Sequence, residues 1–383
     1  MHTVTFYPVG NGDTSLITLT NGKHILMDYR QHGNATDNDK PEYDIAKDLK
    51  KVLKDAKKNS FEVVAFTHAD EDHIERSTEF FYFEHIKKYQ GSDRIKIDEL
   101  WVPAAMLLES VTKDKLDSEF VTWRTEARER LKSKKGIKVF SKPEDLVKLI
   151  ESWDMTVDEL SEHIIDAGTI VDTFSLKKDG VEFFVHSPFM KHCSESGKDI
   201  KKVRNEAALM FNVRFKEGEQ LFDYLAVGDS SAEVLEDIVE ITKNKGREDR
   251  LKWDLFNIPH HCSYLALAYK GDKGEEETIP VAKVKELLLM GNEDAYLICS
   301  SKAFEKEKDA LERDQPPHLQ AKRCYERYLR KVKGRKLFVT MENGGKKKPE
   351  PITIEFSKSG MSKKALVATA ALATAATTPA RAG

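Results

Sequence analysis

The sequence predicts an α/β protein in which two sheets are sandwiched between helices. Strand and helix patterns alternate through the middle of the chain, and antiparallel hairpins are expected at both ends. The chain has 383 residues, of which 40% are hydrophobic. This is enough apolar material for one large α/β domain or two smaller ones.

The first hundred residues predict short strands and two helical segments. Asn21-Gly22 separates two apolar runs and is typical of a tight hairpin. Pro41 opens an amphipathic stretch, 41–58, whose apolar residues recur at helical spacing. A second helical pattern covers 77–89. Strands are expected at Val4–Tyr7, Ser15–Thr20, His24–Asp28, Phe61–Phe66 and Ile97–Val102.

Residues 105–165 differ in character and predict a helical insertion on the core. They are rich in Lys, Glu and Leu at helical spacing and contain a basic stretch, Arg124 to Lys138. Two helices are expected beyond them, at Ala232–Lys243 and Leu319–Val332. The later strands are expected at Thr169–Leu176, Val181–His186, Glu206–Phe215, Leu221–Val227, Leu255–Ile258, Ala295–Ser300, Lys336–Met341 and Pro351–Phe356.

Composition narrows the class of protein. Four cysteines are widely spaced and form no CxxC pair, which favours a reduced, cytoplasmic protein. No apolar run approaches the roughly 18 residues of a membrane span, and the first residues lack the pattern of a signal peptide. The formal net charge of −3 neither favours nor excludes nucleic acid, so a cationic channel would have to be local. The cysteines are Cys193, Cys262, Cys299 and Cys324.

Residues 67–74, Thr-His-Ala-Asp-Glu-Asp-His-Ile, are the strongest chemical signal in the chain. They place four metal-ligand side chains, His68, Asp70, Asp72 and His73, directly after an apolar strand. A strand that opens into a tight loop can aim alternate side chains at one point. The alternative is a solvated acidic loop. Ligand candidates at two further strand ends, Asp229 and the pair His260-His261, favour a dinuclear site that activates water.

At these residues the sequence resembles the metallo-β-lactamase fold, and more narrowly its ComEC-like branch, which occurs in bacterial DNA-uptake proteins. The resemblance implies a four-layer αββα sandwich over residues 1–358, with the helical insertion at about 105–165. The matching motifs are Pro8-Val9-Gly10-Asn11-Gly12-Asp13, Ile25-Leu26-Met27-Asp28, His68-Ala69-Asp70-Glu71-Asp72-His73, Gly228-Asp229 and Pro259-His260-His261-Cys262-Ser263.

The resemblance also implies roles for these residues. His68 and Asp70 would bind a first ion, and Asp72 and His73 would bind a second together with one histidine of the 260–261 pair. We expect that histidine to be His261, and the other to support it. Asp229 would bridge the ions, with a hydroxide between them as nucleophile, although an aspartate before Ser230-Ser231 could also cap the next helix. The catalytic candidates are therefore Asp72, Asp229 and His261.

Four more residues would support the ligands, and two departures from the wider family bear on the metal. Asp70 stands where the family usually has histidine, which moves the preference from Zn²⁺ toward Mn²⁺ or Mg²⁺. The family's Gly-His-Thr motif is absent, so Asn205 is the candidate for that region. Cys262 replaces a glycine and is expected to be a packing residue. The supporting residues are Asp13, Asp28, Asn205 and His318, the last of which could instead approach substrate.

The function expected from these observations is metal-dependent phosphodiester hydrolysis of DNA or RNA, with defence against foreign DNA as one setting. The basic runs Lys198–Arg204 and Arg124–Lys138 could contact phosphates or could be solvated faces. Two alternatives stay open: a hydrolase of a small ester, thioester or nucleotide, and a non-catalytic scaffold on the same fold. In the latter, residues 105–165 or the Ala/Thr-rich tail, 359–383, would dock a protein partner. The tail itself is expected to be flexible.

Overall fold

The computed structural model describes residues 1–33, 43–110, 118–193, 200–345 and 348–365. Its strands form one nine-stranded and one six-stranded sheet. The first has the order β15 (Gly360–Lys363), β14 (Ile352–Ser357), β1 (His2–Phe6), β2 (Ser15–Thr18), β3 (His24–Met27), β4 (Ser60–Ala65), β5 (Lys96–Pro103), β6 (Ile137–Phe140) and β7 (Ile164–Ile165). The second has the order β13 (Lys336–Val339), β12 (Gly291–Cys299), β11 (Trp253–Asn257), β10 (Gln220–Ala226), β9 (Met210–Glu217) and β8 (Val181–Ser187).

Three buried clusters show that the sheets face each other and that helices cover both outer faces. In β4, Val63 and Ala65 pack toward the second sheet, whereas Val64 packs into the cluster that holds α1 (Ile45–Asp55), α4 (Ala104–Leu108) and α5 (Glu119–Lys132). In β12, Tyr296 and Ile298 face the first sheet. The other face of β12 packs on α8 (Ala232–Asn244), α9 (Ala282–Leu288) and α11 (Leu319–Lys331). This alternation is the period-2 pattern of strands buried on both faces, and it gives the four-layer αββα arrangement.

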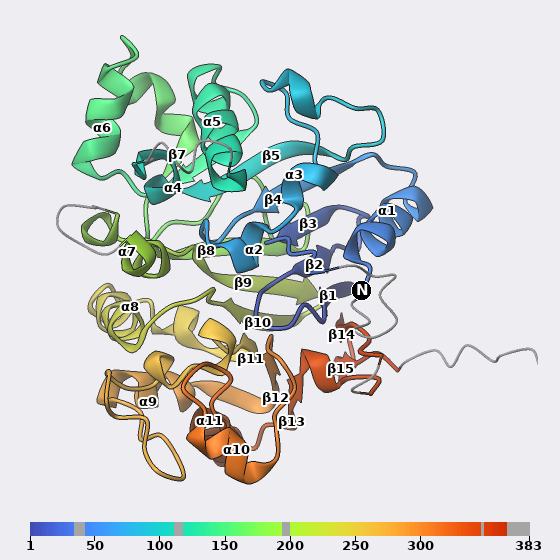
Figure 1. The fold of residues 1–383 in the computed structure, drawn as a ribbon, viewed down its shortest axis with the longest axis vertical. Coiled ribbons are helices and arrows are strands. Elements are labelled where there is room, and N and C mark those ends of the chain that lie inside the picture. Colours follow the sequence, from blue (N-terminus) through green and yellow to red (C-terminus); the bar gives the residue numbers. More distant parts are fainter. Residues whose placement is uncertain (34–42, 111–117, 194–199, 346–347, 366–383) are drawn as a thin grey trace, which may run out of the picture.

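Figure 1 shows the strands crossing the middle of the molecule, with α5 and α6 (Glu144–Glu151) at one end and α9, α10 (Glu307–Glu312) and α11 at the other. Among the helices of the described residues, none is both long and apolar enough to pass through a membrane.

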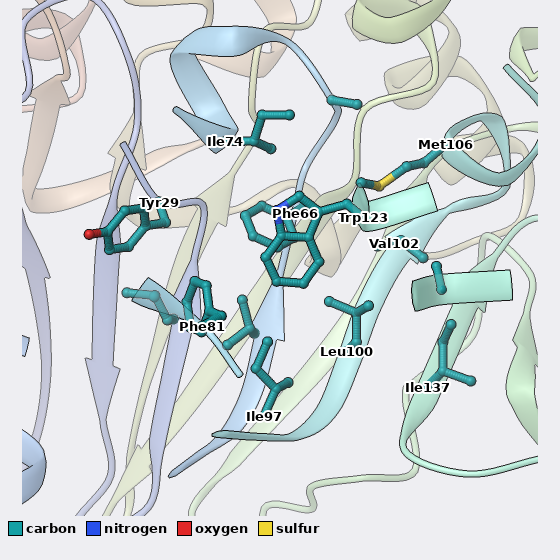
Figure 2. Packing of buried hydrophobic residues seen from close by; sticks show 14 of the residues in the cluster. Tyr29, Phe66, Ile74, Phe81, Ile97, Leu100, Val102, Met106, Trp123 and Ile137 are labelled. Carbon is teal, nitrogen blue, oxygen red and sulfur yellow. The ribbon is translucent and has the colours of Figure 1, made fainter. Parts of the chain in front are cut away.

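The segment 105–165 contains the expected helices, α5 and α6, but it also supplies β6 and β7 to the nine-stranded sheet. It is therefore tied into the core. Figure 2 shows the indole of Trp123, on α5, beside the ring of Phe66, and the ring centroids are 4.5 Å apart. The indole Nε1 of Trp123 donates to Ser77 Oγ at 2.7 Å. Because Phe66 lies two residues before His68, this packing fixes the end of β4 from which the ligand loop begins.

Several predicted elements differ in the structure. The helix expected over 77–89 is broken into α3 (Ser77–Phe80) and a 3-10 turn at Lys87–Tyr89. Between them the chain extends, because Tyr82 donates its backbone N–H to Ile95 and the phenylalanine rings enter the core. The strand expected at Thr169–Leu176 pairs with β8 only near its start, through Thr169 and Val171, and then turns away.

Other elements begin or end at residues that differ from the expected ones. The first helix begins at Ile45, capped by Asp44, and the expected start at Pro41 lies outside the described residues. The nine-stranded sheet continues past residue 358, because β15 pairs with β14. Most of the expected tail, 366–383, lies outside the described residues.

Candidate metal centre

The ligand loop begins where β4 ends between its parallel neighbours β3 and β5. The short helix α2 (Glu71–Ile74) starts after Asp70, so Asp72 and His73 lie in its first turn. His68 and His73 are fully buried, whereas the side chain of Asp72 is 33% exposed. The loop therefore contributes two buried imidazoles and one partly exposed carboxylate.

The second sheet brings two more segments to the same place. Its strands β10 and β11 are parallel, so their carboxyl ends meet at one edge. Asp229 follows β10 after Gly228, whose φ is +40°, and His260, His261 and Cys262 follow β11 with φ of +50°, +51° and +65°. Three successive left-handed residues are unusual in a run without glycine, and they turn the His261 side chain into the interior, where it is 2% exposed.

The predicted ligands converge. His73 Nε2 lies 3.4 Å from Asp229 Oδ1, and His261 Nε2 lies 3.3 Å from Asp229 Oδ2 and 3.2 Å from Asp72 Oδ2. The rings of His68 and His73 are 4.0 Å apart between centroids. Two groups have ligand atoms within 4.8 Å of one another: Asp13, His73, Asp229 and His261, and His68, Asp72 and His73.

Five buried ligand atoms in this cluster make no hydrogen bond among the described residues. They are the Nε2 atoms of His68, His73 and His261, with Asp13 Oδ2 and Asp229 Oδ1. A buried polar atom without a partner costs on the order of 1–3 kcal/mol, so five in one place require an explanation. Imidazole nitrogen and carboxylate oxygen are ligands for divalent ions such as Zn²⁺ and Mn²⁺, and the donor set fits such ions.

The opposite nitrogen of each imidazole is held by a neighbour. His73 Nδ1 lies 2.7 Å from Asp28 Oδ2, and Asp28 also accepts from the backbone N–H and hydroxyl of Thr67, both at 2.7 Å. His261 Nδ1 lies 2.9 Å from the carbonyl oxygen of Ser300. These contacts point Nε2 toward the cluster, which is the usual arrangement behind metal-bound histidines. Asp28, predicted as a supporting residue, is placed accordingly.

Asp13 is closer to the cluster than a remote supporting residue would be. Its Oδ1 accepts from Asn257 Nδ2 at 3.2 Å, and its Oδ2 is 4.0 Å from His261 Nδ1. Burial raises the pKa of Asp13 above its ordinary value. The loop that carries Asp13 packs closely against the backbone of Asp72 at Gly12, where an added Cβ would lie 2.6 Å from the backbone oxygen of Asp72. Residue 12 therefore has no room for a side chain.

The other predicted site residues lie at the margin. Asp70 Oδ1 pairs with Arg204 at 2.7 Å, and its Oδ2 is 3.8 Å from His68 Nε2. The side chain of His260 is 25% exposed, and its Nε2 is 4.0 Å from Asp229 Oδ2. Asn205 has an Oδ1 without a hydrogen-bond partner among the described residues, and it lines the cavity described next.

His318 lies outside the ligand cluster. Its Nε2 donates to the carbonyl oxygen of Asp314 at 3.1 Å, and its Nδ1 accepts from the backbone N–H of Tyr264 at 3.3 Å. Burial lowers its pKa, in keeping with a neutral ring whose two nitrogens are both engaged. Cys262 is fully buried in the cluster behind α8 and α11, and burial raises its thiol pKa, as expected of a packing residue.

A cavity of about 710 Å³ opens beside the cluster. It is lined by carboxylates, guanidinium groups and amides from both sheets. The lining residues are Asn11, Arg30, His32, Asp70, Glu71, Asp72, Glu75, Arg204, Asn205, Asp229, His260, His261, Gln315 and Pro316.

Four of the residues that shape the site were not singled out by sequence reasoning. Asn257 and Ser300 stand at the ends of predicted strands and could have been found by the rule that drew attention to Asp229 and His260. Thr67 is the first residue of the segment 67–74, which was considered only for its histidines and aspartates. Arg204 sits in a basic run that offered no reason to separate it from its neighbours.

The charges of the metal-free cluster predict proton release on metal binding. Burial alone would lower the pKa of His73 and His261, but Asp28 and Asp229 raise it well above the usual value for His73, and Asp229 and Asp72 do so for His261. Their stabilising contribution is complete below the ordinary pKa of 6.5 and is lost as the pH rises through the raised values. A metal must displace these protons, so adding Mn²⁺ at pH 7 should release about two protons per chain. A titration in weak buffer measures this, with NaCl as the control. Metal binding without proton release would contradict it.

No protein-family model matches the sequence, and comparison with curated proteins also gives no match. Solved structures that resemble the chain include the metallo-β-lactamase GOB-18 from Elizabethkingia meningoseptica, at 11% identity and a TM-score of 0.29, covering 86% of this chain and 88% of that one. A long form RNase Z from yeast has 12% identity and a TM-score of 0.33, covering 88% of this chain and 40% of that one. A diphosphatase from the PhnP family has 10% identity and a TM-score of 0.27, covering 82% and 94%. Likeness at these values carries no argument about function, and the αββα arrangement rests on the sheets and buried clusters themselves.

Proposed function

We propose that this protein is a metal-dependent hydrolase of the metallo-β-lactamase fold, and that it cleaves phosphodiester bonds of DNA or RNA with two divalent ions. The observation that carries the proposal is the set of five buried ligand atoms, from four separate chain segments, that have no hydrogen-bond partner among the described residues. His73 Nε2 and His261 Nε2 face carboxylates of this same cluster at 3.2–3.4 Å, so a divalent ion between these groups would bind both of them.

The residues divide between two metal positions. His68 and Asp70 would hold the first ion, and Asp72, His73 and His261 would hold the second. Asp229 contacts both His73 and His261 and would bridge the ions. Bound there, divalent ions supply a water of lowered pKa and positive charge opposite the scissile phosphate. Because carboxylates form much of the donor set, we propose Mn²⁺ rather than Zn²⁺ as the preferred ion.

The charge of the cavity supports an anionic substrate that enters only with metal. Its lining holds five carboxylates and two guanidinium groups, and with His261 protonated the metal-free balance is −2. Two divalent ions would add four positive charges and displace the His261 proton, which changes the balance to +1. The metal-free cavity would repel phosphate, and the loaded cavity would attract it.

Several cationic side chains of the basic run Arg124–Lys138 bond other groups of the protein. Arg124 and Arg128 donate to the backbone oxygens of Glu109 and Leu107, and Arg130 is buried against Glu126. Lys138 pairs with Asp172 at 2.7 Å. Polymer contacts are therefore proposed at the rim of the cavity.

The test is cleavage of labelled single-stranded DNA, double-stranded DNA, RNA and a small phosphodiester, after chelation and reloading with Mn²⁺, Mg²⁺ or Zn²⁺. Asp72→Asn should lower the rate by about a hundredfold. The control is Asp55→Asn, an exposed residue at the end of α1, which should leave the rate unchanged. Cleavage of small esters alone would replace the polymer proposal with a small-substrate hydrolase. A wild-type protein that binds no metal would indicate a scaffold.

A further inference from the structure

One arginine at the cavity wall contacts a residue expected to be a metal ligand. Arg204 lies on α7 (Ile200–Glu206), and its Nη1 donates to Asp70 Oδ1 at 2.7 Å. Its Nε donates to Glu109 Oε2 at 2.6 Å, and its Nη2 donates to Glu109 Oε1. The guanidinium also lies over the ring of Phe120, 5.0 Å from the centroid. It is therefore fixed on three sides.

These contacts form a charged group that is largely removed from water. The side chains of Arg204, Asp70 and Glu109 are 15%, 19% and 7% exposed. Burial alone would lower the pKa of Arg204, but Glu109 and Asp70 raise it above its ordinary value. The guanidinium is thus permanently charged, and two carboxylates against one cation leave the group with a charge of −1.

Asp70 is shared between the arginine and the metal cluster. Its Oδ1 is engaged by Arg204, while its Oδ2 lies 3.8 Å from the unpartnered Nε2 of His68. The second metal position differs, because the structure gives no ion pair from lysine or arginine to Asp72 or Asp229 among the described residues. A fixed positive charge therefore lies beside a carboxylate of the first metal position, and the second position has no such neighbour among the described residues.

On the basis of the proposed function, we propose that Arg204 is a positioning residue that weakens the first metal position through Asp70, so that the two ions bind with different affinities. Two physical effects act in this direction. The guanidinium competes with the ion for the electrons of one carboxylate, and its positive charge repels a second cation nearby. Glu109 opposes both effects, because it draws the guanidinium away from Asp70 and compensates its charge.

This inference makes predictions of opposite sign. Arg204→Gln removes the competing cation and should tighten the weaker binding step by about tenfold or more, since buried charges interact strongly. Glu109→Gln removes the charge of Glu109, so that Asp70 is the remaining carboxylate paired with Arg204, and it should weaken that binding step by about threefold or more. Arg204→Lys retains the charge and should stay within about threefold of wild type. The matched control is Lys202→Gln on the same helix, whose side chain is 64% exposed, and it should change nothing.

The experiment is calorimetric titration of the chelated full-length chain with Mn²⁺ alone, with electron paramagnetic resonance to count bound ions. Thermal melting establishes that each variant is folded, and if Arg204→Gln is not, the Glu109→Gln and Arg204→Lys titrations carry the test. Two unequal steps in wild type, with the weaker one tightened in Arg204→Gln, are the expected result. Two steps that Arg204→Gln leaves unchanged or weakens would overturn the role of Arg204 while leaving the proposed function in place. Absence of any bound Mn²⁺ in wild type would overturn both.

Discussion

Asp229→Asn should lower metal-dependent turnover by about a hundredfold to a thousandfold and reduce bound metal to at most one ion per chain. Asp229 is the carboxylate that lies within 3.4 Å of both His73 and His261, and it is 3% exposed. Asparagine has the same size but only one acceptor oxygen and no charge, so it cannot bridge two cations. Turnover of the best substrate and metal content by mass spectrometry measure the effect.

The control for this prediction comes from the helix that follows Asp229. Glu233→Gln changes an exposed carboxylate in the first turn of α8 and should leave turnover and metal content unchanged. If Asp229→Asn retained two ions and full turnover, the carboxylate would not bridge two ions and the dinuclear assignment would be wrong.

Asp28→Asn should have the largest effect on stability, at about 3–5 kcal/mol, the cost of breaking a buried charged network. Asp28 is 1% exposed and accepts hydrogen bonds from the backbone and hydroxyl of Thr67 while it pairs with His73. Its φ of +55° is left-handed, and asparagine tolerates that region, so the backbone is not strained by the change. Denaturant unfolding of the chelated protein measures the difference.

A milder variant tests the same network. Thr67→Val removes the hydroxyl that donates to Asp28 and should destabilise the protein by only about 1–2 kcal/mol. If Asp28→Asn cost no more than Thr67→Val, the charge of Asp28 would contribute little, and its role would be limited to hydrogen bonding.

The strands and the cluster of polar residues at the candidate metal centre could be predicted because both depend on local pattern. Apolar runs such as Phe61–Phe66 become strands wherever they are buried, and polar residues directly after parallel strands meet at one edge of the sheet. The helix expected at 77–89 failed for a tertiary reason. The buried rings of Phe81 and Phe83 pack into the core from extended chain, and pairing with Ile95 overrides helical spacing.

Within the candidate site, sequence reasoning found the residues that converge but not the residues that surround them. His68, Asp72, His73, Asp229 and His261 come together as expected. The Arg204–Asp70 pair could not be foreseen, because 134 residues separate the two and only the packing of α7 joins them. The contacts of His318 could not be predicted either. Its ring nitrogens form hydrogen bonds with the backbone of Asp314 and Tyr264, and no sequence pattern identifies these two residues as its partners.

The pairing of β1 with β14 has a consequence for how the chain is made. His2 lies opposite Phe356, so β1 acquires one of its two neighbours only after synthesis has reached β14, 354 residues further along the chain for this pair. Until then β1 presents an open edge, which is a template for pairing with other chains. Contacts so distant in sequence also slow folding. While the intervening residues are made, pairing of this β1 edge with another chain competes with its pairing to β14.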